Sequence, residues 1–188
     1  MTGYAFDQFT SDVDSLVRRE KDPKALIQLV QPLLRALLAQ GNWLDEKYRR
    51  PVPGKVYSQY LLYMPPDEAW TAVAFVWPRG ATTPVHDHGT WGVIGVYQGQ
   101  ESETPYRIVE GSITARQVRL VAERTHVMHP GDVSWVLPPG DVHCVCNSGQ
   151  ELAVSVHVYG TNIGKQARHL FELATDEVRD FVSGYDHA

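Results

Sequence analysis

Residues 80–99, which read GATTPVHDHGTWGVIGVYQG, decide how the rest of the chain is interpreted. His86 and His88 lie two positions apart, so both imidazoles point to one face of a strand or extended turn. The run of valine, isoleucine and tyrosine that follows is typical of a β-strand. Either histidine alone is more commonly a surface or core residue, but as a pair in a β-rich setting they are candidate metal ligands.

A second stretch, further along the chain, has a similar combination of turn residues and a histidine. Residues 131–147 read GDVSWVLPPGDVHCVCN, in which a Pro-Pro-Gly turn precedes His143 at the start of another strand. A histidine pair and a distant third histidine meet on one metal only if the sheet curls round, as it does in a barrel. Roughly nine short β-rich runs between Lys55 and Gly160 favour a β-sandwich or barrel.

Both ends of the chain have helical patterning. Residues 23–38 carry leucine and valine at i, i+3 and i+4 spacing, after an Asp22-Pro23 helix start and before Gly41 as a candidate stop. The tail beyond Gly164 returns to helical spacing. We therefore expect one domain over residues 1–188, with a helical flank (1–50), a β-barrel (55–160) and a tail with short helices (161–188).

The composition argues against several classes of function. The 188 residues include 17 Lys+Arg against 22 Asp+Glu, a net charge of −5, and no basic block, which argues against a nucleic-acid partner. There is no run of about 18 apolar residues and no signal-peptide pattern, so we expect neither a membrane span nor secretion. Only two cysteines, Cys144 and Cys146, are present, which excludes a disulfide framework and favours the cytoplasm.

The glycine spacing of the two histidine stretches resembles the two motifs of the cupin superfamily. Cupins are small double-sheet β-barrels of the jelly-roll type with a mononuclear metal inside, so the expected fold class is mainly β. One departure is that Gly92 stands where the first motif usually has a glutamate ligand. Three neutral imidazoles suit iron, zinc, copper or nickel, so ligand type alone does not choose the metal.

A third pattern narrows the family. In residues 155–159, SVHVY, the polar residues alternate with valines and share one face of a strand. A solvated outer face would give the same pattern, whereas a polar barrel interior would turn it into a hydrogen-bonded row. Together with the three histidines, this pattern resembles the bacterial thiol dioxygenases, namely cysteine dioxygenase and its relative 3-mercaptopropionate dioxygenase. The resemblance covers nearly the whole chain, including the helical N-terminal layer.

That resemblance implies a reaction and a set of site residues. The enzyme would use mononuclear non-haem Fe(II) to add both atoms of O₂ to the sulfur of a small thiol carboxylate, giving the sulfinate. The metal ligands would be His86, His88 and His143, and the catalytic row would be Ser155, His157 and Tyr159. The implied partners are a small thiol and O₂, without nucleic acid or membrane, and we expect a monomer or weak homo-oligomer.

Two departures from the animal cysteine dioxygenases bear on the substrate. Those enzymes cross-link a cysteine to the row's tyrosine, but Gly92 or Val93 stands at that position here, so no thioether is expected. They also carry an early arginine where this chain has Gln59, which resembles the 3-mercaptopropionate type and removes a carboxylate clamp. Arg168 matches an arginine of the bacterial members and is either a carboxylate ligand or an exposed helical charge. Tyr57 is a further candidate for substrate contact, and 3-mercaptopropionate is favoured over L-cysteine.

Two other classes of protein are alternatives to a thiol dioxygenase. A metal-dependent cupin isomerase or aromatic-ring dioxygenase would typically retain the carboxylate ligand that this chain lacks. A cupin that senses or stores a ligand without turnover is disfavoured only through the family resemblance. Three tryptophans are expected to be either apolar walls of the site or residues of the hydrophobic core, namely Trp77, Trp91 and Trp135. Four histidines have no assigned role, namely His126, His129, His169 and His187.

Overall fold

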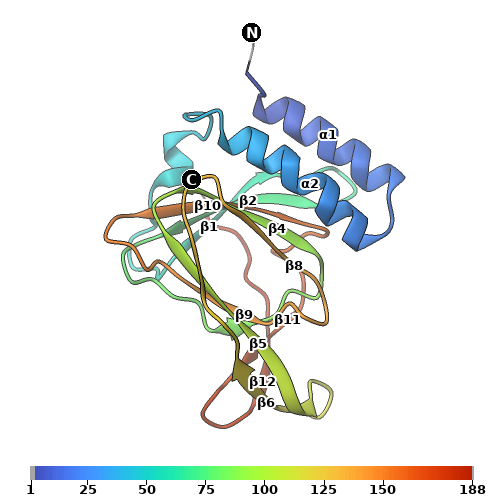
Figure 1. Cartoon of the computed structure of the whole chain (residues 1–188), viewed down its shortest axis with the longest axis vertical. Helices are drawn as coiled ribbons and strands as arrows, with labels where there is room; N and C mark the ends of the chain where they lie inside the picture. Colours follow the sequence, from blue (N-terminus) through green and yellow to red (C-terminus); the bar gives the residue numbers. More distant parts are fainter. Residues whose placement is uncertain (1–2, 188) are drawn as a thin grey trace.

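The computed structural model describes residues 3–187 and has two antiparallel sheets facing each other, with two helices across the outer face of one of them (Figure 1). The first sheet has the order β1-β2-β10-β4-β8, from Ser58–Tyr63, Thr71–Trp77, Ala153–Tyr159, Gly92–Gln98 and Val133–Val136. The second has the order β12-β11-β3-β9-β5-β6, from Val178–Phe181, Arg168–Phe171, Val85–His86, His143–Cys146, Glu101–Ser112 and Gln117–Ala122, and β7 (His126–Met128) pairs with β5. The prediction of a mainly β, double-sheet barrel behind a helical layer is confirmed.

The helical layer begins where the sequence predicts. Helix α2 (Pro23–Leu38) follows α1 (Phe6–Arg19), and the Asp22 side chain accepts a hydrogen bond from the first turn of α2. A short 3₁₀ helix (Glu46–Arg49) leads into the barrel. Helix α2 packs closely on β4 because Gly95 has no side chain: a Cβ there would lie 2.6 Å from a Leu38 methyl group. This contact covers the outer face of the first sheet with leucines.

Strand β10 separates the helical layer from the barrel interior. It lies between β2 and β4, and all seven of its residues are buried. Its valines belong to the apolar cluster under the helices, whereas Tyr159 belongs to the cluster inside the barrel. The alternation in residues 155–159 therefore reflects two buried faces of different polarity, and the solvated outer face is excluded.

The tail departs from the prediction of short helices over residues 161–188, which is wrong. Strands β11 and β12 form an antiparallel hairpin at the edge of the second sheet, opposite the helices (Figure 1). Strand β11 also pairs with β3, placing Leu170 opposite His86. The free edge of β3 stabilises an extended conformation that the local helical spacing does not indicate. Residues 113–116, within the β-rich part of the sequence, form a turn between β5 and β6.

Membrane-spanning helices were not expected from the sequence. Over residues 3–187, the structure has no helix that is long and apolar enough to cross a membrane.

Candidate active site

Three histidines converge inside the barrel. His86 ends β3 and His143 begins β9, and these two residues are directly opposed in the sheet. His88 follows His86 by two positions on the loop that leads to β4. Their candidate ligand atoms all lie within 4.8 Å of one another, and the three side chains are buried. The structure thus brings together all three of the histidines predicted as ligands.

Each of these imidazoles is fixed through its Nδ1 atom. His86 and His88 donate from Nδ1 to backbone carbonyls, at 3.0 and 3.2 Å, and His143 donates to the Glu103 carboxylate at 2.6 Å. Because Nδ1 carries the hydrogen in each case, the free lone pair lies on Nε2. Three closely spaced imidazoles with free Nε2 lone pairs fit a divalent transition metal with coordination positions left open for other ligands.

The protonation state of these histidines also suits metal binding. Burial lowers the pKa of His86 and of His88 well below the usual value, and the nearby His143 adds to the effect. Burial is the largest single influence on the pKa of Glu103 and works to raise it, but the hydrogen bond and charge of His143, with smaller contributions from other neighbours, together lower that pKa overall. Neutral imidazoles at His86 and His88 and an ionised carboxylate at Glu103 are therefore the states expected near neutral pH.

Acidic residues that were not predicted from the sequence hold the histidines in place. Asp141 accepts the backbone N–H groups of His88 and Gly89, both at 2.9 Å. Asp87, between the two ligand histidines, accepts from the backbone and Nδ1 of His169 at 2.7 and 2.6 Å, so His169 has a structural role. Two features of the sequence could have indicated these residues. One is an acidic residue two positions before His143, and the other is an acidic residue between the two histidines of the HxH motif.

The Ser155–His157–Tyr159 row is continuous in the structure. Ser155 Oγ and His157 Nε2 share a hydrogen bond of 2.8 Å, and His157 Nδ1 and the Tyr159 hydroxyl share another of 2.8 Å. The indole N–H of Trp77 donates to Ser155 Oγ at 3.0 Å. The Tyr159 ring stacks on His88, with centroids 5.4 Å apart, so the row ends beside the histidine cluster. Burial lowers the pKa of His157 to about 3 and raises the pKa of Tyr159, which keeps both groups neutral.

A buried carboxyl group lies at the other end of the row. Glu101 lies on the same inward face of β5 as Glu103 and is 0% exposed. Neither of its carboxyl oxygens has a hydrogen-bond partner. Burial raises its pKa to about 8, although the neighbouring Ser155 hydroxyl works to lower it. Glu101 is therefore protonated at neutral pH.

Glycine at position 92 is explained by the approach of Tyr159. The two residues are directly opposed in neighbouring strands, and a Cβ on Gly92 would lie 2.8 Å from Cδ1 of the tyrosine ring. The position has no room for a glutamate ligand or a cysteine with the ring in this place. Cys144 and Cys146 are both free thiols.

A cavity of about 110 Å³ opens beside the histidine cluster. It is much smaller than the pockets that hold nucleotides or drug-sized ligands. Its lining includes His86, His143, His157, Tyr159, Tyr57, Gln59 and Arg168. Trp77 also lines it. Trp91 packs under the helices, as the alternative of a core residue predicts, and Trp135 is 54% exposed, so it is neither a wall of this cavity nor a core residue.

Arg168 is a buried cation in this cavity. It lies on β11 and is 4% exposed, so the alternative of an exposed helical charge is wrong. Its guanidinium packs over the Phe181 ring at 4.4 Å, and Nη2 donates to Ser183 Oγ at 2.7 Å, while Nε has no partner. Burial lowers its pKa, yet an arginine remains charged at neutral pH. Among the described residues that line the cavity, none is an aspartate or a glutamate.

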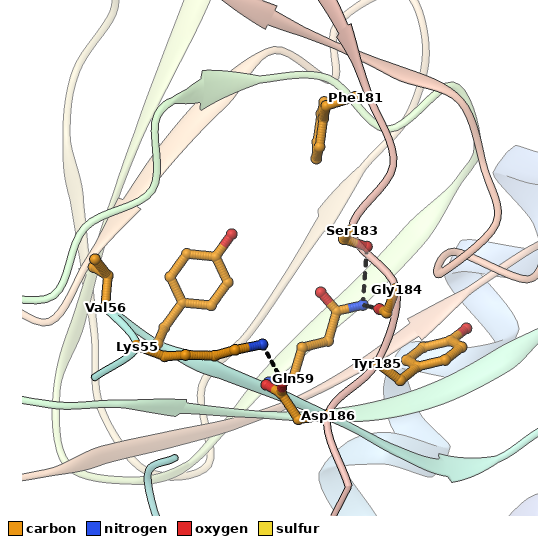
Figure 2. A pocket seen from close by; sticks show the side chains of 9 residues that line it. Lys55, Val56, Gln59, Phe181, Ser183, Gly184, Tyr185 and Asp186 are labelled. Carbon is orange, nitrogen blue, oxygen red and sulfur yellow. Dashed lines mark hydrogen bonds and ion pairs between the residues drawn. The ribbon is translucent and has the colours of Figure 1, made fainter. Parts of the chain in front are cut away.

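A second cavity, of about 240 Å³, adjoins the first and shares Tyr57, Gln59 and Phe181 with it. Residues 182–186, which we call the strap, pass along one side of it (Figure 2). Gln59 donates from Nε2 to Ser183 Oγ at 3.2 Å and to the Gly184 carbonyl at 3.1 Å. Figure 2 shows the Gln59 amide turned towards the strap. The strap thus holds a side chain that was predicted to contact the substrate.

Comparison with known proteins gives a family match over residues 59–168, to the model described as cysteine dioxygenase type I. Three solved structures illustrate the similarity to cupin and double-stranded β-helix proteins. The cupin domain of Schizosaccharomyces pombe Cnp3 is 18% identical (57% of this chain, 66% of that one, TM-score 0.43). An uncharacterised Klebsiella pneumoniae protein with a double-stranded β-helix domain is 20% identical (65% and 91%, TM-score 0.45). A Cupin 2 conserved barrel protein of Salinispora arenicola is 19% identical (62% and 83%, TM-score 0.42).

Proposed function

Because the chain belongs to the cysteine dioxygenase type I family, whose model matches more than half of it, we propose that it is a non-haem Fe(II) thiol dioxygenase. The substrate is a small thiol carboxylate, with 3-mercaptopropionate favoured over L-cysteine, and the product is the sulfinate. The partners are the thiol and O₂. We also propose a cytoplasmic location, which the two cysteines without a disulfide support.

The observation that carries this proposal is Arg168. A guanidinium that is buried without a carboxylate partner is costly, unless a ligand supplies the anion. Arg168 lines a small cavity that also reaches two of the three clustered histidines, and its Nε–H is buried without a hydrogen-bond partner. A short molecule with a carboxylate at one end and a thiol at the other suits a small cavity that has a cation and a candidate metal site in its lining.

The protein's own groups have separate tasks in this reaction. When bound by His86, His88 and His143, the iron supplies a Lewis acid that favours the thiolate form of the substrate and a centre that activates O₂. Arg168 binds the carboxylate through charge-assisted hydrogen bonds. Tyr159 is held by His157 and presents a neutral phenol beside His88. This phenol donates a hydrogen bond to the reacting groups.

The polarity of the cavity supports the preference for 3-mercaptopropionate. This substrate carries one negative charge, which Arg168 balances. L-Cysteine adds an ammonium group, for which the described lining residues provide no carboxylate. Gln59 is neutral and its amide nitrogen is already engaged by the strap, so it provides no charge for a zwitterion.

The proposal is tested by oxygen uptake and sulfinate formation with Fe(II)-loaded protein. 3-Mercaptopropionate, L-cysteine and cysteamine are compared in parallel. We expect the highest kcat/KM with 3-mercaptopropionate, a lower value with cysteine and the lowest with cysteamine, which has no carboxylate. Oxygen uptake with none of the three thiols would refute the dioxygenase function, and equal values for 3-mercaptopropionate and cysteamine would remove the role of Arg168.

A further inference from the structure

We propose that Ser183 is a positioning residue that holds Arg168 ready for the substrate carboxylate. This inference rests on the proposed function, since it concerns the same carboxylate. It adds a residue of the strap to a site otherwise made by the barrel strands.

The hydrogen bonds at Ser183 point to this role. Its Oγ accepts from Arg168 Nη2 at 2.7 Å and from Gln59 Nε2 at 3.2 Å. A serine hydroxyl has two acceptor positions, so these two donors occupy both. The hydroxyl therefore links the only arginine in the lining of the inner cavity, within the described residues, to a side chain shared by both cavities.

The effect on Arg168 is to restrict a flexible side chain. An unrestrained arginine loses conformational freedom when it binds a ligand, which weakens affinity. Here one face of the guanidinium packs on Phe181 and one N–H is held by Ser183. The rest of the guanidinium is left for the ligand carboxylate, on a side chain that is already oriented.

The strap does not depend on Ser183 for its own position. The Asp186 N–H donates to the Gln59 carbonyl at 2.7 Å, and the Gln59 N–H donates back to the Asp186 carboxylate at 2.9 Å. Lys55 pairs with the same carboxylate (Figure 2). Gly184 donates from its N–H to the Gly164 carbonyl at 3.0 Å. Removal of one hydroxyl should therefore leave the backbone of the strap in place.

The test measures thiol binding to Fe(II)-loaded protein without oxygen, by calorimetry, for 3-mercaptopropionate and for 2-mercaptoethanol, which has no carboxylate. In Ser183→Ala we expect the Kd for 3-mercaptopropionate to rise roughly fivefold to tenfold, with the Kd for 2-mercaptoethanol unchanged. Ser183→Thr retains a hydroxyl and should recover most of the affinity. Ser112→Ala, at an exposed turn of the β5–β6 hairpin, is the matched control. In turnover with O₂, Ser183→Ala should raise KM with little change in kcat.

Several results would overturn the inference. These are an unchanged Kd in Ser183→Ala, an equal loss for both thiols, an equal loss in the Ala and Thr variants, or no binding of 3-mercaptopropionate by the wild-type protein. Wild-type protein that binds the thiol but consumes no O₂ would refute the dioxygenase function alone. In that case the binding comparison still decides the role of Ser183.

Discussion

His143 donates its Nδ1–H to the Glu103 carboxylate over 2.6 Å, and both residues are buried. Such a partner fixes the ring and makes Nε2 a better metal ligand. We expect Glu103→Ala to lower the affinity for Fe(II) by about 10–100-fold, and Glu103→Gln, which retains an acceptor, to lower it less. Competition with a metal chelator measures this affinity. Glu110→Ala, at an exposed position of the same strand, is the control, and wild-type affinity in Glu103→Ala would contradict the expectation.

Gly92 allows the Tyr159 ring to approach its strand. In Gly92→Ala the new methyl group would meet ring atoms at 2.8 and 2.9 Å, so the ring or the strand must move. We expect a loss of about 1–3 kcal/mol in the free energy of unfolding, typical of overpacking, and a lower kcat because the tyrosine is displaced. Gly140→Ala is the control, since a Cβ there comes no closer than 3.7 Å to the Leu137 carbonyl. Equal stability of the two variants in urea unfolding would show that the ring adjusts freely.

Glu101 should make stability depend on pH. Its pKa is about 8 in the folded state against an ordinary value of 4.5, so between these values the folded protein retains a proton that the unfolded chain loses. The contribution of Glu101 to the free energy of unfolding therefore falls as pH rises from 4.5 to 8 and levels off above that. Glu101→Gln removes this dependence. The free energy of unfolding of the variant minus that of the wild type should therefore increase from pH 5 to pH 8, by on the order of a few kcal/mol.

Urea unfolding of the iron-free protein at both pH values measures this difference. Glu110→Gln, where the carboxylate is exposed, should show no such change. A difference between Glu101→Gln and wild type that is the same at pH 5 and pH 8 would mean that Glu101 is ionised throughout this range.

Tyr159→Phe separates iron binding from turnover. The hydroxyl bonds to His157 and does not belong to the histidine cluster, so we expect full iron content. Loss of the phenol should lower kcat/KM with 3-mercaptopropionate by roughly 10²-fold, within the usual range for a positioned proton donor or acceptor. Metal analysis and oxygen uptake on the same sample give both values. Unaltered kcat/KM would remove Tyr159 from the reaction.

Much of the barrel could be predicted because its signals are local. The spacing of His86 and His88 and the turn before His143 are features of short stretches, and the alternation in residues 155–159 indicates a strand with two different faces. Two glycines in this part of the chain, Gly92 and Gly95, are sites of close packing, which their sequence context does not indicate.

The remaining features depend on contacts between distant segments. Arg168 lies in a stretch with helical spacing, and only the free edge of β3 makes it a strand. Glu101 and Glu103, in the sequence ESE, have the pattern of a solvent-exposed strand, because the partner of Glu103 is 40 positions away. Gln59 was predicted to contact the substrate only from the family resemblance, and its bond to the strap spans 124 positions.

The two halves of the site are held by different parts of the fold. The three histidines are fixed by neighbouring strands and loops deep in the barrel, whereas the mouth of the cavity depends on pairing between β1 and a strap 127 positions later. Such a peripheral segment opens with a lower free energy than the core. Mild denaturant should therefore release the strap first, leaving a protein that retains its metal but no longer distinguishes thiols by their carboxylate. Hydrogen exchange would show this as early loss of protection at Asp186, while the amides of β10 remain protected.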